Sequence, residues 1–208
     1  MMEQAGGFLL GYGFGSIPFG LLIAALAGHG DIRKIGSGNI GATNVLRTGS
    51  KALAGLTLLA DMAKGYVPVL IAARWGLDVS LAAAMGAFIG HLFPVWLKFR
   101  GGKGVATYIG ILFALYWPAA VIFIGVWGMT AFLSRISSLS ALVASGVMPF
   151  VPALASDKMP AMADRTALTS VFLIISLLIF LAHRQNIFRL VTRSEPKIGE
   201  DKTSGPGR

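Results

Sequence analysis

The chain has no cysteine and few charged residues, and both shortages narrow its class. Without a thiol it forms no disulfide, no thiolate metal site and no thioester acyl-enzyme intermediate. Only 13% of its 208 residues are charged and 55% are hydrophobic, whereas a soluble domain is roughly 25% charged and 45–50% apolar. The 27 glycines are typical of membrane bundles, where small residues let helices approach closely. The composition therefore predicts a polytopic membrane protein.

Acidic residues and histidines are also scarce. The chain has nine Asp and Glu and three His, and no group of them has the spacing of metal ligands. We therefore expect neither a metal nor another cofactor.

Seven apolar runs follow one another along the chain. One of them, 105–116, would make only about 18 Å of helix against roughly 30 Å of hydrocarbon. The first run lacks a basic leader and a small-residue cleavage site, so we expect a retained helix rather than a signal peptide. The predicted fold is an all-α polytopic membrane domain, 1–201, followed by a disordered tail, 202–208. The seven predicted spans are 7–27, 52–72, 79–97, 105–116, 119–133, 139–155 and 166–182.

Charge placement decides between six and seven spans. With seven spans and the N-terminus outside, 14 of the 18 Lys and Arg fall in the inner segments, which are 28–51, 98–104, 134–138 and 183–208. Omitting the short helix would move Arg135 and the Arg-rich tail outside, against the positive-inside bias. We therefore predict an outer N-terminus and a cytoplasmic C-terminus. Topology and attraction to anionic lipid explain such basic segments, but not why the same segments are rich in Gly, Ser and Asn.

The first polar segment, 36–47, follows the first span. It contains a GxGxxG pattern with Asp61 twenty residues beyond Gly41. A membrane helix precedes it instead of a β-strand, so the dinucleotide interpretation is rejected. Its glycines free the backbone to present N–H groups to an anion, and Arg47 can bind a phosphate in bidentate fashion. The side-chain donors are Ser37, Asn39, Thr43 and Asn44. A polar re-entrant loop that caps a helix is the alternative.

The second polar segment, 99–107, opens the short helix. Gly101, Gly102 and Gly104 surround Lys103. Leu97 stands where a Walker A loop has its first glycine, so this is not a nucleotide loop. Backbone N–H groups and the helix dipole would still favour an anion here, at about 1.5–3 kcal/mol for each charge-assisted hydrogen bond. The alternative is a tight turn with an interfacial lysine.

A third set of polar residues is dispersed. Arg135, Ser137, Ser138 and Ser140 lie near the inner end of one span, and His183, Arg184, Asn186 and Arg189 near the inner end of the last. A histidine at a helix C-terminus is also a common interfacial cap, so His183 alone supports either role. Farther along the tail, Glu195 and Lys197 fit a solvated charge pair.

Several features inside the spans predict structure more than chemistry. Asp61 and Lys64 are three residues apart and can face each other, which neutralises charge in lipid. His91, before Pro94, is typical of a packed, hydrogen-bonded helix histidine. Residues at four-residue spacing indicate close helix packing; they are Gly7, Gly11 and Gly15, and Ala82, Gly86 and Gly90.

Taken together, these motifs resemble those of the acyl-phosphate:glycerol-3-phosphate acyltransferases (PlsY). Gly36 to Arg47 resembles the family's first signature, and Asp61 to Gly65 with Gly90 to Thr107 resembles the central one. His183 to Glu195 is similar to the shorter C-terminal signature. The resemblance covers about 7–197. One departure is Ala141, where the family usually has a second serine, three positions after Ser138; its role would shift to Ser140 or be absent.

The resemblance implies a seven-helix enzyme of the bacterial plasma (inner) membrane, with its active site at the cytoplasmic face. It implies acyl transfer from acyl phosphate to the sn-1 hydroxyl of glycerol 3-phosphate, which gives lysophosphatidic acid and phosphate. The phosphate-binding residues that it implies are Ser37, Arg47, Lys103, Ser138, His183 and Asn186. An acyl-phosphate-forming enzyme is the candidate for functional coupling, since the donor must be supplied. No nucleic-acid partner is expected.

The available residues agree with that chemistry. An acyl phosphate carries a good leaving group, so no protein nucleophile is required. The residues five after His29, His91 and His183 are not acidic, which rules out the HxxxxD mechanism of other glycerolipid acyltransferases.

We therefore expect direct attack by the glycerol hydroxyl. Lys103 and the amides of 101–104 would stabilise the developing charge, while Arg47, Ser37 and Asn39 hold phosphate oxygens. His183 or the substrate phosphate would accept the proton.

Two other classes share this composition. A transporter should place polar residues near the bilayer midplane, often in repeated halves, whereas here the motifs gather on one side and no internal repeat is visible. A non-catalytic scaffold would not need two glycine-rich anion loops facing one compartment.

Overall fold

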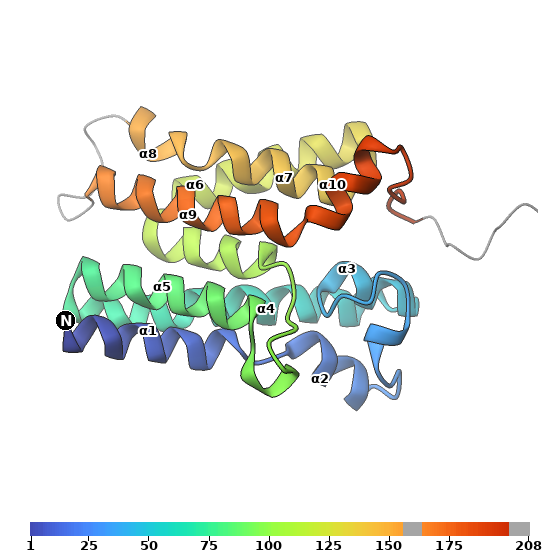
Figure 1. Cartoon of the computed structure of the whole chain (residues 1–208), viewed down its shortest axis with the longest axis horizontal. Helices are drawn as coiled ribbons and strands as arrows, with labels where there is room; N and C mark the ends of the chain where they lie inside the picture. The colour runs from blue at the N-terminus through green and yellow to red at the C-terminus, as the bar shows by residue number, and fades with distance from the viewer. Residues whose placement is uncertain (156–163, 200–208) are drawn as a thin grey trace, which may run out of the picture.

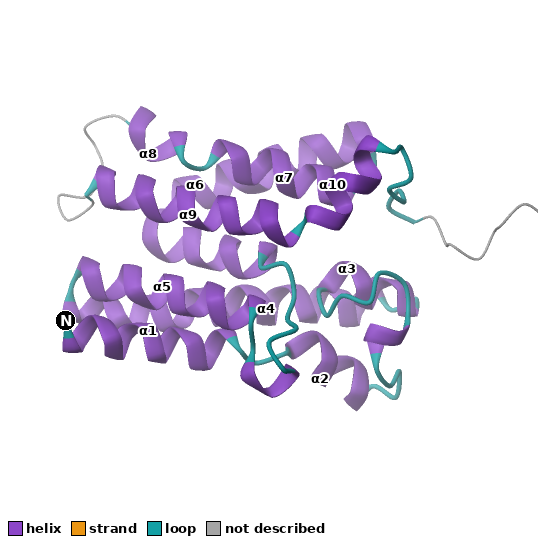
Figure 2. Cartoon of the chain, in the orientation of Figure 1, coloured by secondary structure: helices purple, strands orange, loops and turns teal. Residues whose placement is uncertain are grey.

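Every regular element in the described part of the chain is helical (Figure 2). The structure, a computed structural model, describes residues 1–155 and 164–199. The predicted tail 202–208 and Lys158 lie outside these residues. The α-helices are α1 Met2–Gly15, α2 Phe19–Leu26, α3 Ala42–Val45, α4 Lys51–Ala72, α5 Leu77–Leu92, α6 Val105–Ser134, α7 Ser137–Val147, α8 Phe150–Leu154, α9 Arg165–Ala182 and α10 Arg184–Val191, with 3-10 turns at Ile32–Lys34, Leu46–Thr48, Ala73–Trp75 and Val95–Leu97.

The long helices lie side by side along one axis (Figure 1). Five helical stretches are long and apolar enough to cross a membrane, namely Met2–Leu26, Lys51–Trp75, Leu77–Leu97, Val105–Ser134 and Arg165–Ala182, and a shorter apolar helix covers Ser137–Val147. The all-α membrane class predicted from composition is confirmed.

Local residue chemistry sets where these helices begin and break. The Ser50 side chain caps α4 by accepting the Leu53 N–H, and Asp164 caps α9 by accepting two N–H groups. The first predicted span is broken before Pro18, between α1 and α2, and the span 139–155 is broken before Phe150 by Pro149. Proline has no N–H to donate to the helical hydrogen-bond ladder, which accounts for both breaks.

The predicted helices 105–116 and 119–133 correspond to the two arms of α6, which a break at Tyr116 separates. The backbone is extended at Tyr116, with φ −158° and ψ 90°. A straight helix of that length would separate its ends by about 45 Å, yet Val105 and Ser137 line the same cavity. The chain therefore reverses at Tyr116. Pro118 is tolerated there because the first turn of the second arm needs no N–H from it.

α1 and α5 pack closely against each other, as the four-residue spacing of their small residues predicted. A Cβ on Gly11 would overlap the Ala83 carbonyl, and one on Gly86 would overlap the Phe8 carbonyl. The two backbones are thus in contact along their length. Such contact supplies van der Waals attraction in a solvent that offers no hydrophobic drive between helices.

An aromatic cluster joins α5, both arms of α6 and α9. The Tyr108 ring meets Phe88, Phe123 and Phe172 edge-on, with centroids 6.3, 5.7 and 6.1 Å away. All four side chains are fully buried. Edge-to-face pairs add about 0.5–1.5 kcal/mol each beyond burial, so this cluster fixes where the first arm of α6 lies.

The intramembrane pair Asp61 and Lys64 faces as predicted. Lys64 Nζ lies 2.7 Å from Asp61 Oδ1, and the side chains of Lys64 and Asp61 are 1% and 3% exposed. Lys64 Nζ also donates to the Ile17 carbonyl over 2.8 Å, at the break between α1 and α2. The pair therefore neutralises buried charge and ties α4 to the first helical stretch.

Candidate active site

One large cavity of about 730 Å³ lies where the three predicted polar segments meet. Ten of the twelve predicted site residues line it, namely Ser37, Asn39, Thr43, Asn44, Arg47, Lys103, Gly104, Ser138, His183 and Asn186; Gly101 and Gly102 do not. An apolar wall completes it, made by Leu58, Met62, Ile109, Ile124 and Trp127. The cavity lining therefore combines polar and basic side chains with apolar ones.

The first segment is held in shape by Asn44. This residue is 2% exposed; its amide donates to the Ile32 carbonyl over 2.7 Å, and its Oδ1 accepts the Ser37 N–H over 3.0 Å. Gly36 has φ +56°, and a Cβ there would meet both Arg47 and Asn44 Oδ1. Asn44 thus fixes the loop, while Ser37 and Arg47 face the cavity.

The second segment is fastened to the end of α5. The Gly101 N–H donates to the Leu92 carbonyl over 3.0 Å and the Gly102 N–H to the His91 carbonyl over 3.1 Å. These two amides are therefore already satisfied, and anion binding by them stays a prediction that the hydrogen bonding does not favour. The reason is that a helix end leaves its last carbonyls without partners, and the glycines meet that need.

The N–H groups that precede the first intrahelical bond of α6 are better placed. That bond runs from the Tyr108 N–H to the Gly104 carbonyl over 2.7 Å, so the amides of Val105 and Ala106 have no intrahelical acceptor. Both residues line the cavity. Gly104 starts the helix with φ +81°, and a Cβ on it would overlap the Phe88 ring. Only glycine suits this position.

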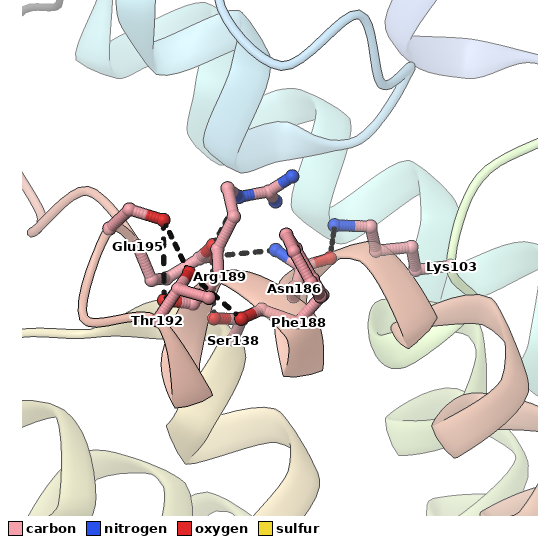
Figure 3. Close-up of polar contacts among 8 residues, drawn as sticks. Lys103, Ser138, Asn186, Phe188, Arg189, Thr192 and Glu195 are labelled. Carbon is pink, nitrogen blue, oxygen red and sulfur yellow. Dashed lines mark hydrogen bonds and ion pairs between the residues drawn. The ribbon is translucent and has the colours of Figure 1, made fainter.

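The third set forms a connected network around Glu195 (Figure 3). Glu195 Oε1 accepts from Ser138 Oγ over 2.7 Å and from Asn186 Nδ2 over 2.6 Å, and Oε2 pairs with Arg189 Nε at 2.6 Å. With its donors thus engaged, the Asn186 amide turns its Oδ1 to Lys103 Nζ, 2.6 Å away. Figure 3 shows Lys103 meeting Asn186 from the side opposite Glu195.

The expectation that Glu195 belongs to a solvated charge pair was wrong. Its side chain is 7% exposed and pairs with Arg189, because the segment after α10 folds back and the Ile198 N–H donates to the Arg135 carbonyl. The sequence carried a signal for it in the resemblance to the C-terminal signature. Burial alone opposes ionisation of Glu195, but hydrogen bonds from Ser138, Asn186 and Arg189 hold its pKa below the ordinary value.

Burial changes the pKa of two further groups that line the cavity, Lys103 and His183. It lowers the pKa of Lys103 to about 8, with Glu195 opposing the shift and the cations Arg189 and Arg47 adding to it. Burial also lowers the pKa of His183 to about 4, and the charge of Lys103 adds to that shift. At neutral pH the site therefore presents a charged lysine and an uncharged imidazole.

The hydrogen bonding of His183 determines its tautomer. Nδ1 lies 2.8 Å from the Ile179 carbonyl, which can only accept, so a neutral ring carries its proton on Nδ1. The lone pair then lies on Nε2. Since His183 lines the cavity, this nitrogen is the one available to accept a hydrogen bond or a proton there.

Ser140 does not take the place of the family serine that is Ala141 in this chain. Ala141 is buried and lines the cavity. The Ser140 hydroxyl instead donates to the Ile136 carbonyl over 2.9 Å, and Ser140 does not line the cavity. Ser137 and Ser138 are thus the serines of this helix end that line the cavity.

Fold and cavity together define an integral membrane protein whose cavity is lined by both basic and apolar side chains. A family model described as glycerol-3-phosphate acyltransferase matches residues 6–193. The glycerol-3-phosphate acyltransferase of Brucella anthropi is 55% identical over 194 residues, which cover 93% of this chain and 92% of that protein. That of Rhodopseudomonas palustris is 56% identical over 195 residues, covering 93% and 95%.

Two crystal structures of PlsY, an integral membrane glycerol 3-phosphate acyltransferase, have the same fold. The glycerol 3-phosphate form has a TM-score of 0.82 at 34% identity and covers 95% of this chain and 94% of that one. The lysophosphatidic acid form has a TM-score of 0.84 at 33% identity, with 94% and 95% covered. The chain belongs to the glycerol-3-phosphate acyltransferase family and is an acyltransferase of the PlsY type. The predicted enzyme class and family are confirmed.

Proposed function

We propose that this enzyme transfers a fatty acyl group from acyl phosphate to the sn-1 hydroxyl of glycerol 3-phosphate. The observation that carries the proposal is one cavity whose lining includes both Arg47 and Lys103 and the apolar side chains Trp127 and Ile124. A phosphorylated head group and a hydrocarbon chain are the two chemistries that such a cavity accommodates.

The reaction needs no covalent enzyme intermediate. The glycerol oxygen forms an ester bond to the acyl carbon while the bond from that carbon to the phosphate oxygen breaks. Inorganic phosphate leaves with the bonding electrons. The chain has no cysteine, and the Ser138 hydroxyl already donates to Glu195, so the cavity's role is to orient reactants and stabilise charge.

We assign Lys103 and the first amides of α6 the role of stabilising the negative charge that develops during acyl transfer. Lys103 Nζ donates to Asn186, and an ammonium retains further N–H groups for a phosphate or carbonyl oxygen. The first amides of α6 and its dipole act in the same direction. Arg47 and Ser37, which also line the cavity, are assigned to the second phosphate, together with Asn39 and Thr43.

We assign His183 the role of binding the attacking hydroxyl group of glycerol 3-phosphate. Its Nε2 lone pair can accept the hydroxyl hydrogen and orient the oxygen toward the acyl carbon. A pKa of about 4 makes it a weak base, so the phosphate of glycerol 3-phosphate, whose second pKa is about 6, is the competing proton acceptor.

Seven crossings with a cytoplasmic site fit the same cavity. The two arms of α6 and the pair α7 and α8 would supply the fourth, fifth and sixth crossings. Most of the polar residues that line the cavity belong to the basic segments predicted to be cytoplasmic. These segments are 28–51, 98–104, 134–138 and 183–208. Soluble glycerol 3-phosphate would enter from that face of the bacterial inner membrane, and an acyl-phosphate-forming enzyme would supply the donor.

Phosphate release by the purified protein tests the proposal. The protein is given palmitoyl phosphate and glycerol 3-phosphate, with palmitoyl-CoA as the control donor, and the product is identified by mass spectrometry and regiospecific hydrolysis. We expect release that needs both substrates, 1-acyl product, and a loss of at least roughly 100-fold in Lys103→Ala and Arg47→Ala. Turnover with palmitoyl-CoA alone would refute the donor, and a 2-acyl product would refute the sn-1 assignment.

A further inference from the structure

We propose that His91 is a positioning residue for the reaction, which fixes where Lys103 stands in the cavity. The proposal rests on the role assigned to Lys103 above. His91 lies in the last turn of α5, on a different element from the residues assigned to the substrates, and it is 3% exposed. It touches the chain on both sides of Lys103.

The backbone makes the first connection. α5 ends at Leu92, and the carbonyls of its last turn need donors from elsewhere. The carbonyls of His91 and Leu92 accept from Gly102 and Gly101, over 3.1 and 3.0 Å. The residue before Lys103 is therefore bonded directly to His91, and the loop cannot move relative to α5 without breaking this bond.

The imidazole makes the second and third connections. A Cβ on Gly102 would overlap His91 Nε2, so the ring lies directly against the Gly102 backbone. Its Nδ1 is 3.0 Å from Thr107 Oγ1, and Thr107 is fully buried in the first turn of α6. The ring thus holds Gly102 on one side of Lys103 and Thr107 on the other.

The His91 imidazole can act in this position without carrying a charge. A neutral ring can accept from or donate to the Thr107 hydroxyl and does not repel the ammonium groups nearby. Its contribution is therefore shape and hydrogen bonding, which is what a positioning role requires.

Position matters here because Lys103 makes a short, directed contact. Its Nζ donates to Asn186 Oδ1 over 2.6 Å, and a misplacement of about 1 Å in an active site can cost roughly 100-fold in rate. Removing the ring would leave space beneath Gly102 and free one side of the loop. Lys103 would then sample positions from which it meets Asn186 and substrate less often, and water would reach it more easily.

The first test compares His91→Ala, His91→Asn and Thr107→Val with wild type in detergent, with Ser80→Ala as control. Ser80 is a buried polar residue at the other end of α5. We expect kcat to fall roughly 10–100-fold in His91→Ala, less in His91→Asn and Thr107→Val, and to stay within about twofold in Ser80→Ala. If His91→Ala does not fold, the other two variants decide. Wild-type kcat in folded variants would overturn the proposal.

A suppressor experiment separates positioning from general loss of stability. Gly102→Ala should lower activity because its methyl group overlaps the ring, and the double variant with His91→Ala should be no worse than the more impaired single variant. Strictly multiplicative losses in folded protein would contradict contact between the two residues.

Amine labelling gives a readout independent of turnover. Acetic anhydride labelling of Lys103, followed by peptide mass spectrometry across alkaline pH, should give a midpoint near 8 in wild type. In His91→Ala the midpoint should move upward toward the ordinary lysine value of about 10.4, because water solvates the ammonium. An unchanged midpoint in folded His91→Ala would overturn the proposal even if the donor assignment had failed.

Discussion

At the residue scale, the proposed site depends on how a partly buried lysine is kept charged. Lys103 loses solvation in the cavity wall, and Glu195 offsets only part of that loss. Asn186 stands between them, donating to Glu195 and accepting from Lys103. A dianionic phosphate bound beside Lys103 would raise its pKa again, so substrate and lysine favour each other's charged forms.

The pH–activity profile should therefore have an alkaline limb, where activity falls because Lys103 loses its charge. Its pKa is lowered to about 8, and a lysine with a lowered pKa loses its charge as pH rises through that value. We expect kcat/KM to fall above about pH 8, and the limb in kcat to lie higher because the bound phosphate stabilises the ammonium.

Initial rates across pH 6 to 10 measure this limb, with Lys103→Arg as the matched variant. A guanidinium keeps its charge throughout, so the alkaline limb should disappear whatever activity remains. The same limb in Lys103→Arg would assign the titration to another group.

At the element scale, the helices act in two ways: they hold the bundle together and they shape the apolar wall. α1 and α5 approach closely enough that their glycines contact the opposite backbone. The second arm of α6 instead turns Trp127 toward the cavity and Trp117 outward, 65% exposed.

Gly11→Ala should destabilise the protein where Gly13→Ala does not. A Cβ on Gly11 would overlap the Ala83 carbonyl, while Gly13 has nothing within 4 Å. Overpacking of this kind costs about 1–3 kcal/mol, which thermal denaturation in detergent would show as a lower Tm. Equal Tm values for the two variants would contradict close contact between α1 and α5.

Trp127→Ala should change which acyl donors are preferred. The indole is part of the apolar wall, and each buried CH₂ contributes about 0.8 kcal/mol. We expect the ratio of kcat/KM for long against short acyl phosphates to change several-fold in Trp127→Ala and to stay constant in Trp117→Ala. If both variants kept the wild-type ratio, the acyl chain would have to lie elsewhere.

At the scale of the whole molecule, the basic loops and the cavity share one end of the bundle (Figure 1). The site is assembled from segments far apart in the chain, since Arg47, Lys103 and His183 all line one cavity. The proposed orientation places this end in the cytoplasm.

Single cysteines can test that orientation, because the native chain contains none. His29 and Trp75 are both exposed, in segments predicted to be inside and outside. In intact cells a membrane-impermeant maleimide should label Trp75→Cys and spare His29→Cys, and permeabilised cells should label both. The reverse pattern would invert the topology.

The sequence predicted most of the residues that line the cavity and fewer of the hydrogen bonds among them. Ten of twelve predicted residues line the cavity, because phosphate chemistry draws on few residue types and these gathered in the basic loops. Gly101 and Gly102 were expected to bind the anion, but their amides are bonded to α5. Glu195 was expected in solvent and is buried. Both differences arise from contacts with a distant segment.

The sequence by itself determined that this chain is an all-helical membrane protein and which segments supply most of the polar residues that line its cavity. Hydropathy, charge and residue type are local properties, so they are readable along the chain. Only the tertiary structure decided the burial of the Glu195 side chain and the contact of His91 with Gly102. Each depends on which of several distant groups satisfies a given donor, acceptor or space, and that competition is settled only when the helices pack.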